Sequence, residues 1–272
     1  MPLLQDFAGD HGLYLDRKGL RPCRRGKKCT WIDANGNAHD LDFVLERGGT
    51  ADKIGTPAAF IETAWRRYTK HSRNKVQEIQ GAIEPLAATY SRAGAFKGAV
   101  LAGVFTEGAL AQLRSLGFSI VHISYVAVVA AFAKFGIDAR SDEQTPDADF
   151  QAKVDAFEKL TPARRTRLAA AVARANQPAM RQFLAALASS VSRQIERILV
   201  LALHGTAQEV LTVPDALQLV EGYADDGRAK PVERFDIEVR YNNGNRIAGS
   251  FVDKAGAIEF LGGFLPLAQQ IP

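Results

Sequence analysis

Two acidic residues lie in short apolar segments in the first quarter of the sequence. Asp42 belongs to Leu-Asp-Phe-Val-Leu-Glu, and Glu62 belongs to Phe-Ile-Glu-Thr-Ala. Carboxylate oxygens are the ligands that Mg²⁺ prefers, and Mg²⁺ activates water and polarises phosphate during phosphodiester hydrolysis. A carboxylate in a central strand is costly to bury unless it is paired or bound to a cation. The two residues therefore predict a Mg²⁺ site formed by Asp42 and Glu62.

The segment after Glu62 is strongly basic, and no acidic residue interrupts it before Glu78. Cations at this density are typical of a surface that neutralises the phosphates of a nucleic acid. The alternative is a solvated helix face, although such a face usually carries interspersed acids. Trp65 and Tyr68 could stack on bases or pack in the core. The cations expected to contact double-stranded DNA are Arg66, Arg67, Lys70 and Arg73; Lys75 ends the run.

The hydrophobic pattern indicates which elements position these residues. Three short strands, over residues 30–32, 41–46 and 58–65, are expected to form a meander that carries both carboxylates. Asn35-Gly36 is a strong hairpin signal between the first two strands. A stretch over residues 17–28 contains seven Lys or Arg together with Gly and Pro, which predicts a basic loop.

An amphipathic helix is expected after Ser72, because apolar residues recur there at steps of three and four. Pro85 predicts a kink or an early end to this helix. Further along, apolar runs predict buried strands at 98–105 and 118–124, with helices at 107–116 and 126–135. This order favours an α/β (α+β) fold, a mixed central sheet flanked by helices.

The second half of the chain predicts a helical insert and a second small α/β unit. A polar segment, 138–149, resembles a linker, and Asn242-Asn-Gly-Asn predicts a second hairpin. We therefore expect three parts. They are a core over 1–137, a linker with helices over 138–194, and a C-terminal α/β unit over 195–272 that serves in recognition or in forming a homodimer.

The segments around Asp42 and Glu62, about twenty residues apart, resemble the PD-(D/E)XK signature of many restriction endonucleases. The resemblance covers roughly residues 1–125 and implies a restriction-endonuclease-like core, with Asp42 as the first acid of the motif and Glu62 as the second. Two positions depart from the pattern. Leu41 replaces the proline of the motif, and Ala64 stands where the family has a lysine that orients water or stabilises the phosphate.

The missing lysine leaves three interpretations: a cation has moved, another group does its work, or the site is inactive. Strand alternation places Arg66 on the face of Glu62, but arginine is a poor base. Lys70 or Lys75 could reach the site from the segment that follows, and Lys75 is the preferred catalytic replacement. Glu46 shares a strand face with Asp42 and is a possible third acid.

The function that these features imply is a Mg²⁺-dependent DNA endonuclease, of the restriction type by resemblance. One rival is a catalytically inactive nucleic-acid-binding protein that keeps the fold, which Ala64 favours. Another rival is a protein-interaction module whose basic run contacts an acidic partner. Cleavage that depends on a divalent cation would distinguish the first of these from the endonuclease.

Composition sets broad limits on these hypotheses. The net charge of +4 is mild, and 47% of the residues are hydrophobic, as in an ordinary globular protein. No apolar run approaches the length of a membrane span, and the expected location is the cytoplasm, with no membrane partner. Cys23 and Cys29 could form a disulfide, but two free thiols are favoured in a reducing compartment.

Overall fold

The computed structural model describes residues 2–67, 72–202, 205–223 and 234–265. The chain forms two compact units, Met1–Val191 and Ser192–Pro272. The mixed α/β fold class expected from the sequence is confirmed: a five-stranded mixed sheet and two antiparallel sheets are combined with helices. The helices expected in a separate insert over 138–194 belong, as far as Val191, to the first unit.

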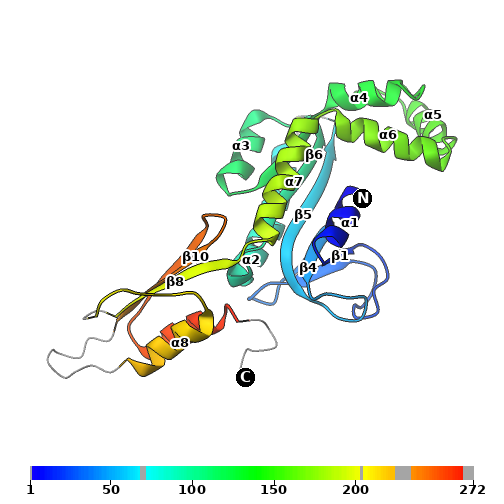
Figure 1. Cartoon of the computed structure of the whole chain (residues 1–272). Coiled ribbons are helices and arrows are strands. Elements are labelled where there is room, and N and C mark those ends of the chain that lie inside the picture. The colour runs from blue at the N-terminus through cyan, green and yellow to red at the C-terminus, as the bar shows by residue number, and fades with distance from the viewer. Residues whose placement is uncertain (1, 68–71, 203–204, 224–233, 266–272) are drawn as a thin grey trace. The chain divides into compact units, whose positions relative to one another are not determined.

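The central sheet of the first unit has the strand order β1-β4-β5-β6-β7 (Figure 1). Strands β1, β4 and β5 pair antiparallel, and β5, β6 and β7 pair parallel. The central strand, β5, is the longest of the five. The strand bounds are β1 Leu13–Arg17, β4 Phe43–Arg47, β5 Thr56–Arg66, β6 Phe96–Gly103 and β7 Ser119–Ser124.

Helices cover both faces of this sheet. On one face, α2 (Ser72–Thr89) and α3 (Glu107–Ser115) pack over Phe60 and Leu101. On the other face, Ile61 lies in a second core with residues of α1, α4 and α7. Because Phe60 and Ile61 are neighbours in β5, their side chains point to opposite faces of the sheet, and β5 contributes to both cores. The remaining helices are α1 Pro2–Asp10, α4 Tyr125–Ala133, α5 Asp147–Glu158, α6 Pro162–Arg174 and α7 Gln177–Val191.

The expected meander over 30–32, 41–46 and 58–65 is wrong in its pairing. Strand β2 (Cys29–Ile32) pairs with β3 (Ala38–Leu41) in a separate two-stranded sheet. The expected strand 41–46 divides at Asp42, after which β4 pairs with β5 and with β1. The hairpin at Asn35-Gly36 is confirmed, and Gly36 takes a positive φ of 83°. Strand β1 was missed because its Leu-Tyr-Leu pattern is too short to separate from the end of a helix.

The amphipathic helix expected after Ser72 is confirmed, but it does not end early at Pro85. Helix α2 continues to Thr89, and the Thr89 hydroxyl donates to the Pro85 carbonyl at 2.8 Å. Proline removes one backbone donor. Burial of the apolar face of α2, including Ile83 and Leu86 on either side of the proline, outweighs that loss.

The second unit is a four-stranded antiparallel sheet, in the order β11-β10-β8-β9, with two helices. Its core joins Ile198 and Val239 of the sheet to Val220 and Leu261 of the helices. The hairpin expected at 242–245 connects β10 and β11. The elements are β8 Ile195–Ala202, β9 Gln208–Val210, α8 Val213–Gly222, β10 Phe235–Tyr241, β11 Arg246–Phe251 and α9 Lys254–Gly262.

Among the residues that the structure describes, no helix has both the length and the apolar content needed to span a membrane.

Candidate metal and nucleic-acid site

Asp42 lies at the bend between β3 and β4, directly before the pairing of Phe43 with Ile61. Its backbone N–H donates to Glu62 Oε1 at 3.0 Å. Its own carboxylate oxygen Oδ2 accepts from the backbone N–H of Thr63 at 2.9 Å and from the Thr63 hydroxyl at 2.6 Å. The structure therefore brings the two predicted acids together, with Thr63 holding the Asp42 side chain.

Glu62 is the buried member of this pair, with 7% of its surface exposed. Burial, followed by the negative charge of Asp42, raises the pKa of Glu62 to about 7. The hydrogen bond from the Asp42 N–H and the positive charge of Lys75 act in the opposite direction, and Glu78 adds to the increase. Glu62 is thus poised between its two protonation states near neutral pH.

This pKa makes stability depend on pH. The folded chain holds the Glu62 proton to about pH 7, whereas an ordinary glutamate releases it near 4.5. The stabilisation that the retained Glu62 proton gives the folded state is therefore complete below pH 4.5 and is lost as pH rises through 7. We expect the wild type to lose about 2–3 kcal/mol more unfolding free energy between pH 5 and pH 8.5 than Glu62→Gln does.

Urea unfolding at the two pH values measures this difference. Glu158→Gln, at an exposed glutamate that ends α5, is the matched control and should keep the pH profile of the wild type. Parallel profiles for the wild type and Glu62→Gln would show that Glu62 ionises normally in the folded chain.

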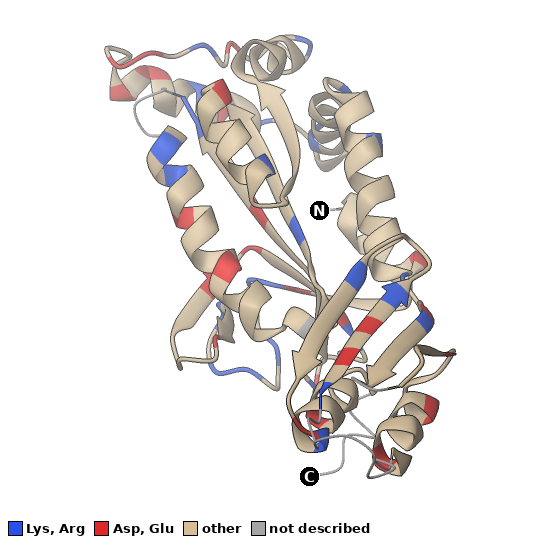
Figure 2. Ribbon diagram, turned by 90° about the vertical axis from the view of Figure 1, so that its left-hand side faces the viewer, with Lys and Arg blue, Asp and Glu red and all other residues tan. Residues whose placement is uncertain are grey.

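Helix α2 brings Lys75 to the site. Lys75 Nζ lies 3.2 Å from Glu78 Oε2, and Arg66 Nη2 lies 3.9 Å from the same oxygen. The positive charge of Lys75 also acts to lower the pKa of Glu62. Figure 2 shows the basic bands at the start of α2 and the acidic bands further along it. Lys75 is thus paired with Glu78 and exerts its charge on Glu62.

The end of β5 beside Arg66 depends on a glycine in the neighbouring strand. The Arg66 carbonyl accepts from the Val104 N–H at 2.7 Å, and Gly103 has a φ of 101°. A Cβ atom at Gly103 would lie 2.0 Å from that carbonyl oxygen. Glycine is therefore required where β6 passes the end of β5.

The described cations Arg67 and Arg73 have different surroundings. Arg67 packs over the ring of Phe150 in α5, with its guanidinium carbon 4.2 Å from the ring centroid. Arg73 is exposed on α2, and Lys70 lies outside the described residues. Trp65 packs against Tyr125, with ring centroids 6.0 Å apart. Phosphate contact by Arg66, Arg67, Lys70 and Arg73 stays a prediction.

Glu46 is not a third acid of this site. Its carboxylate accepts from Arg21 Nη1 at 2.6 Å and from Arg21 Nη2 at 3.0 Å, and also from the Gly55 N–H at 2.7 Å. Arg21 also lies 2.9 Å from Asp16, which pairs in turn with Arg24. These four side chains form a buried ionic cluster that the sequence reasoning missed. The only sequence signal for it is Asp16, an acid within an apolar alternation.

The two carboxylates have the donor chemistry that Mg²⁺ prefers. Within the described part of the chain, their hydrogen bonds use Asp42 Oδ2 and Glu62 Oε1, which leaves Asp42 Oδ1 and Glu62 Oε2 for a cation. Among all the residues that the structure describes, no group of three or more His, Cys, Asp or Glu side chains has metal-binding geometry. Mg²⁺ is commonly held by only one or two carboxylates together with substrate phosphate.

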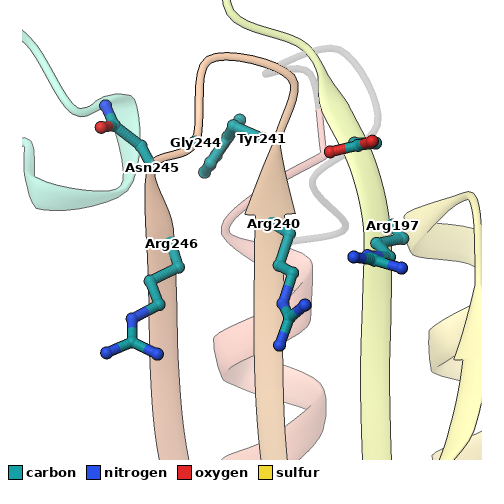
Figure 3. A pocket seen from close by; sticks show the side chains of 7 residues that line it. Arg197, Arg240, Tyr241, Gly244, Asn245 and Arg246 are labelled. Atoms are coloured by element: carbon teal, nitrogen blue, oxygen red, sulfur yellow. The ribbon is translucent and has the colours of Figure 1, made fainter.

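The second unit has a hollow on its sheet, around the end of the β10–β11 hairpin (Figure 3). Its arginines already have acidic neighbours. Arg240 and Arg246 pair with Glu238, and Arg197 pairs with Glu209. This balance of charge gives the hollow little attraction for a free anion. The lining residues are Glu196, Arg197, Arg240, Tyr241, Gly244, Asn245 and Arg246.

We found no match of the chain to a protein-family model, to a curated protein or to a solved structure.

Both cysteines, Cys23 and Cys29, are free thiols, as favoured above.

Proposed function

We propose that the protein is a Mg²⁺-dependent endonuclease that hydrolyses phosphodiester bonds in double-stranded DNA. The observation that carries the proposal is the juxtaposition of Asp42 with the buried Glu62, at the end of the β4–β5 pairing and within the electrostatic influence of Lys75. Two adjacent carboxylates are repulsive unless a proton or a cation lies between them. The resemblance to the PD-(D/E)XK signature supports the same assignment and favours a restriction-type enzyme.

Each residue has a distinct role in the proposed reaction. Asp42 Oδ1 and Glu62 Oε2 would hold Mg²⁺, which supplies Lewis-acid polarisation of the phosphate and activation of water. Thr63 fixes the Asp42 carboxylate with two hydrogen bonds, so that its second oxygen keeps one direction. Glu62 must lose its proton before it binds a cation, which its pKa near 7 permits at neutral pH.

Lys75 is the proposed replacement for the lysine that the motif lacks at Ala64. Ala64 carries no charge, and its side chain packs against the core beneath α2. The positive charge of Lys75, on α2, acts on the Glu62 carboxyl instead. From there it would stabilise the negative charge that develops on the phosphate in the transition state.

A nucleic-acid-binding protein without catalytic activity is the second candidate, and Ala64 favours it. Incubation of the purified protein with mixed plasmid DNA and Mg²⁺ separates the two candidates. We expect new ends that require Mg²⁺ and disappear with EDTA, and mapping of those ends would define any sequence preference. Salt-sensitive binding without cleavage, over a range of Mg²⁺ and Mn²⁺ concentrations, would contradict the endonuclease.

A transition-state role for Lys75 predicts a loss of turnover without a matching loss of affinity. Lys75→Ala should lower kcat by about 10-fold to 100-fold and change KM by less than about 3-fold, because the charge acts mainly in the transition state. Lys75→Arg should restore part of the turnover. Lys134→Ala, at the exposed lysine that directly follows α4, is the control. Equal losses in turnover and affinity would make Lys75 a phosphate-binding residue.

A further inference from the structure

The loop over residues 18–28 begins and ends beside Asp42. Strand β1 ends at Arg17, which pairs with Phe43, the residue after Asp42. Strand β2 begins at Cys29, which pairs with Leu41, the residue before Asp42. Two separate sheets thus bring the two ends of one loop to the two sides of the same acid.

This loop carries exposed positive charge. No acidic residue occurs between Asp16 and Asp33, and Arg17–Lys28 contains seven Lys or Arg. Lys28 pairs with Asp40 at 2.5 Å but keeps 72% of its side chain exposed. The exposed cations of the loop are Lys18, Arg25, Lys27 and Lys28.

The buried ionic cluster holds the loop in place. Arg21 anchors the loop to the rest of the first unit. It pairs with Glu46 and donates from Nη2 to the carbonyls of Thr50 and Lys53, both at 2.7 Å. Arg24 pairs with Asp16, and its guanidinium lies over the Trp31 ring. Such a loop presents its exposed cations at a low cost in conformational entropy.

We propose that the loop over 18–28 binds the phosphate backbone of a nucleic acid next to the carboxylate pair. The position of the partner rests on the proposed function, whereas its chemistry follows from the charge of the loop. A regular row of phosphates matches cations held on a rigid loop, and each contact releases counterions. An anionic membrane fits less well, because Leu20 is the one exposed large hydrophobic side chain of the loop, and surface insertion needs an apolar face.

The test compares two triple variants of the full-length chain. Lys18→Gln, Arg25→Gln and Lys27→Gln remove three cations of the loop. Lys134→Gln, Lys159→Gln and Arg181→Gln remove three exposed cations elsewhere in the first unit. Affinity for a random-sequence DNA duplex is measured in EDTA between 50 and 300 mM salt, and urea unfolding checks that both variants are folded.

Each neutralised phosphate contributes roughly −0.9 to the slope of log affinity against log salt, so the loop variant should flatten the slope by about 2.7. The control variant should keep the slope of the wild type. A folded loop variant with the wild-type slope would overturn the proposal. So would loop-dependent binding to vesicles of anionic phospholipid with no change in DNA affinity.

Because EDTA prevents metal-dependent cleavage, this result is independent of catalysis. Loss of DNA binding in the loop variant supports the loop assignment even if plasmid DNA is never cut, which would defeat the endonuclease alone. Conversely, Mg²⁺-dependent cleavage together with an unchanged slope would defeat the loop assignment alone.

Discussion

Asp42→Asn and Glu62→Gln should each lower Mg²⁺-dependent cleavage of duplex DNA by about 10²-fold or more, while DNA affinity in EDTA changes little. Each substitution keeps the shape of the side chain but removes one of the two charges that would hold the cation. Asp42→Asn keeps an oxygen that can accept from Thr63, so the bend between β3 and β4 should persist. Rates of plasmid nicking under single-turnover conditions provide the measurement.

Asp40→Asn is the matched control for this pair. Asp40 lies two residues before Asp42, and its carboxylate pairs with Lys28 and Thr30 on the surface of the β2–β3 hairpin. We expect its cleavage rate to stay within about 3-fold of the wild type, because exposed pairs contribute little. Cleavage at the wild-type rate by Asp42→Asn and Glu62→Gln would remove the carboxylate pair from the mechanism.

Arg21→Met should destabilise the first unit by about 3–5 kcal/mol. Arg21 is the shared partner of Asp16 and Glu46, and all three side chains are almost fully buried. Removing the cation leaves two buried carboxylates, of which only Asp16 keeps another cation, Arg24. The free energy of unfolding in urea at pH 7 is the quantity to measure.

Arg25→Met is the comparison for this substitution, because Arg25 belongs to the same loop and is exposed. Arg25→Met should change the free energy of unfolding by no more than about 0.5 kcal/mol. A destabilisation below about 1 kcal/mol at pH 7 would show that water or a rearranged loop compensates the buried acids.

The sequence predicted the features of this fold that depend on local patterns. Asn35-Gly36 specifies its hairpin through turn geometry alone, and the apolar residues of α2 identify its buried face without reference to the sheet. Asp42 and Glu62 were found because each interrupts an apolar segment. Their proximity followed from the expected pairing of segment 41–46 with segment 58–65. Strand β4 does pair with β5, although Asp42 itself lies at the bend just before β4.

Features that depend on distant pairing could not be predicted in the same way. The division of a continuous apolar segment at Asp42 arises because Leu41 and Phe43 pair with different strands, β2 and β1. The ion pair between Arg21 and Glu46 joins a loop to a strand 25 residues away. No spacing rule relates those two positions, so Glu46 was assigned to the wrong cluster.

The order of the two units along the chain also sets the order in which they are synthesised. All of the candidate site lies before residue 192, where the second unit begins. At about 5–20 residues per second, translation of residues 192–272 takes several seconds after the first unit is complete. During that interval a nascent chain holds the carboxylate pair without its C-terminal unit. If the proposed nuclease activity resides in the first unit, a restraint exerted by the second unit can act on it only after the second unit has been synthesised.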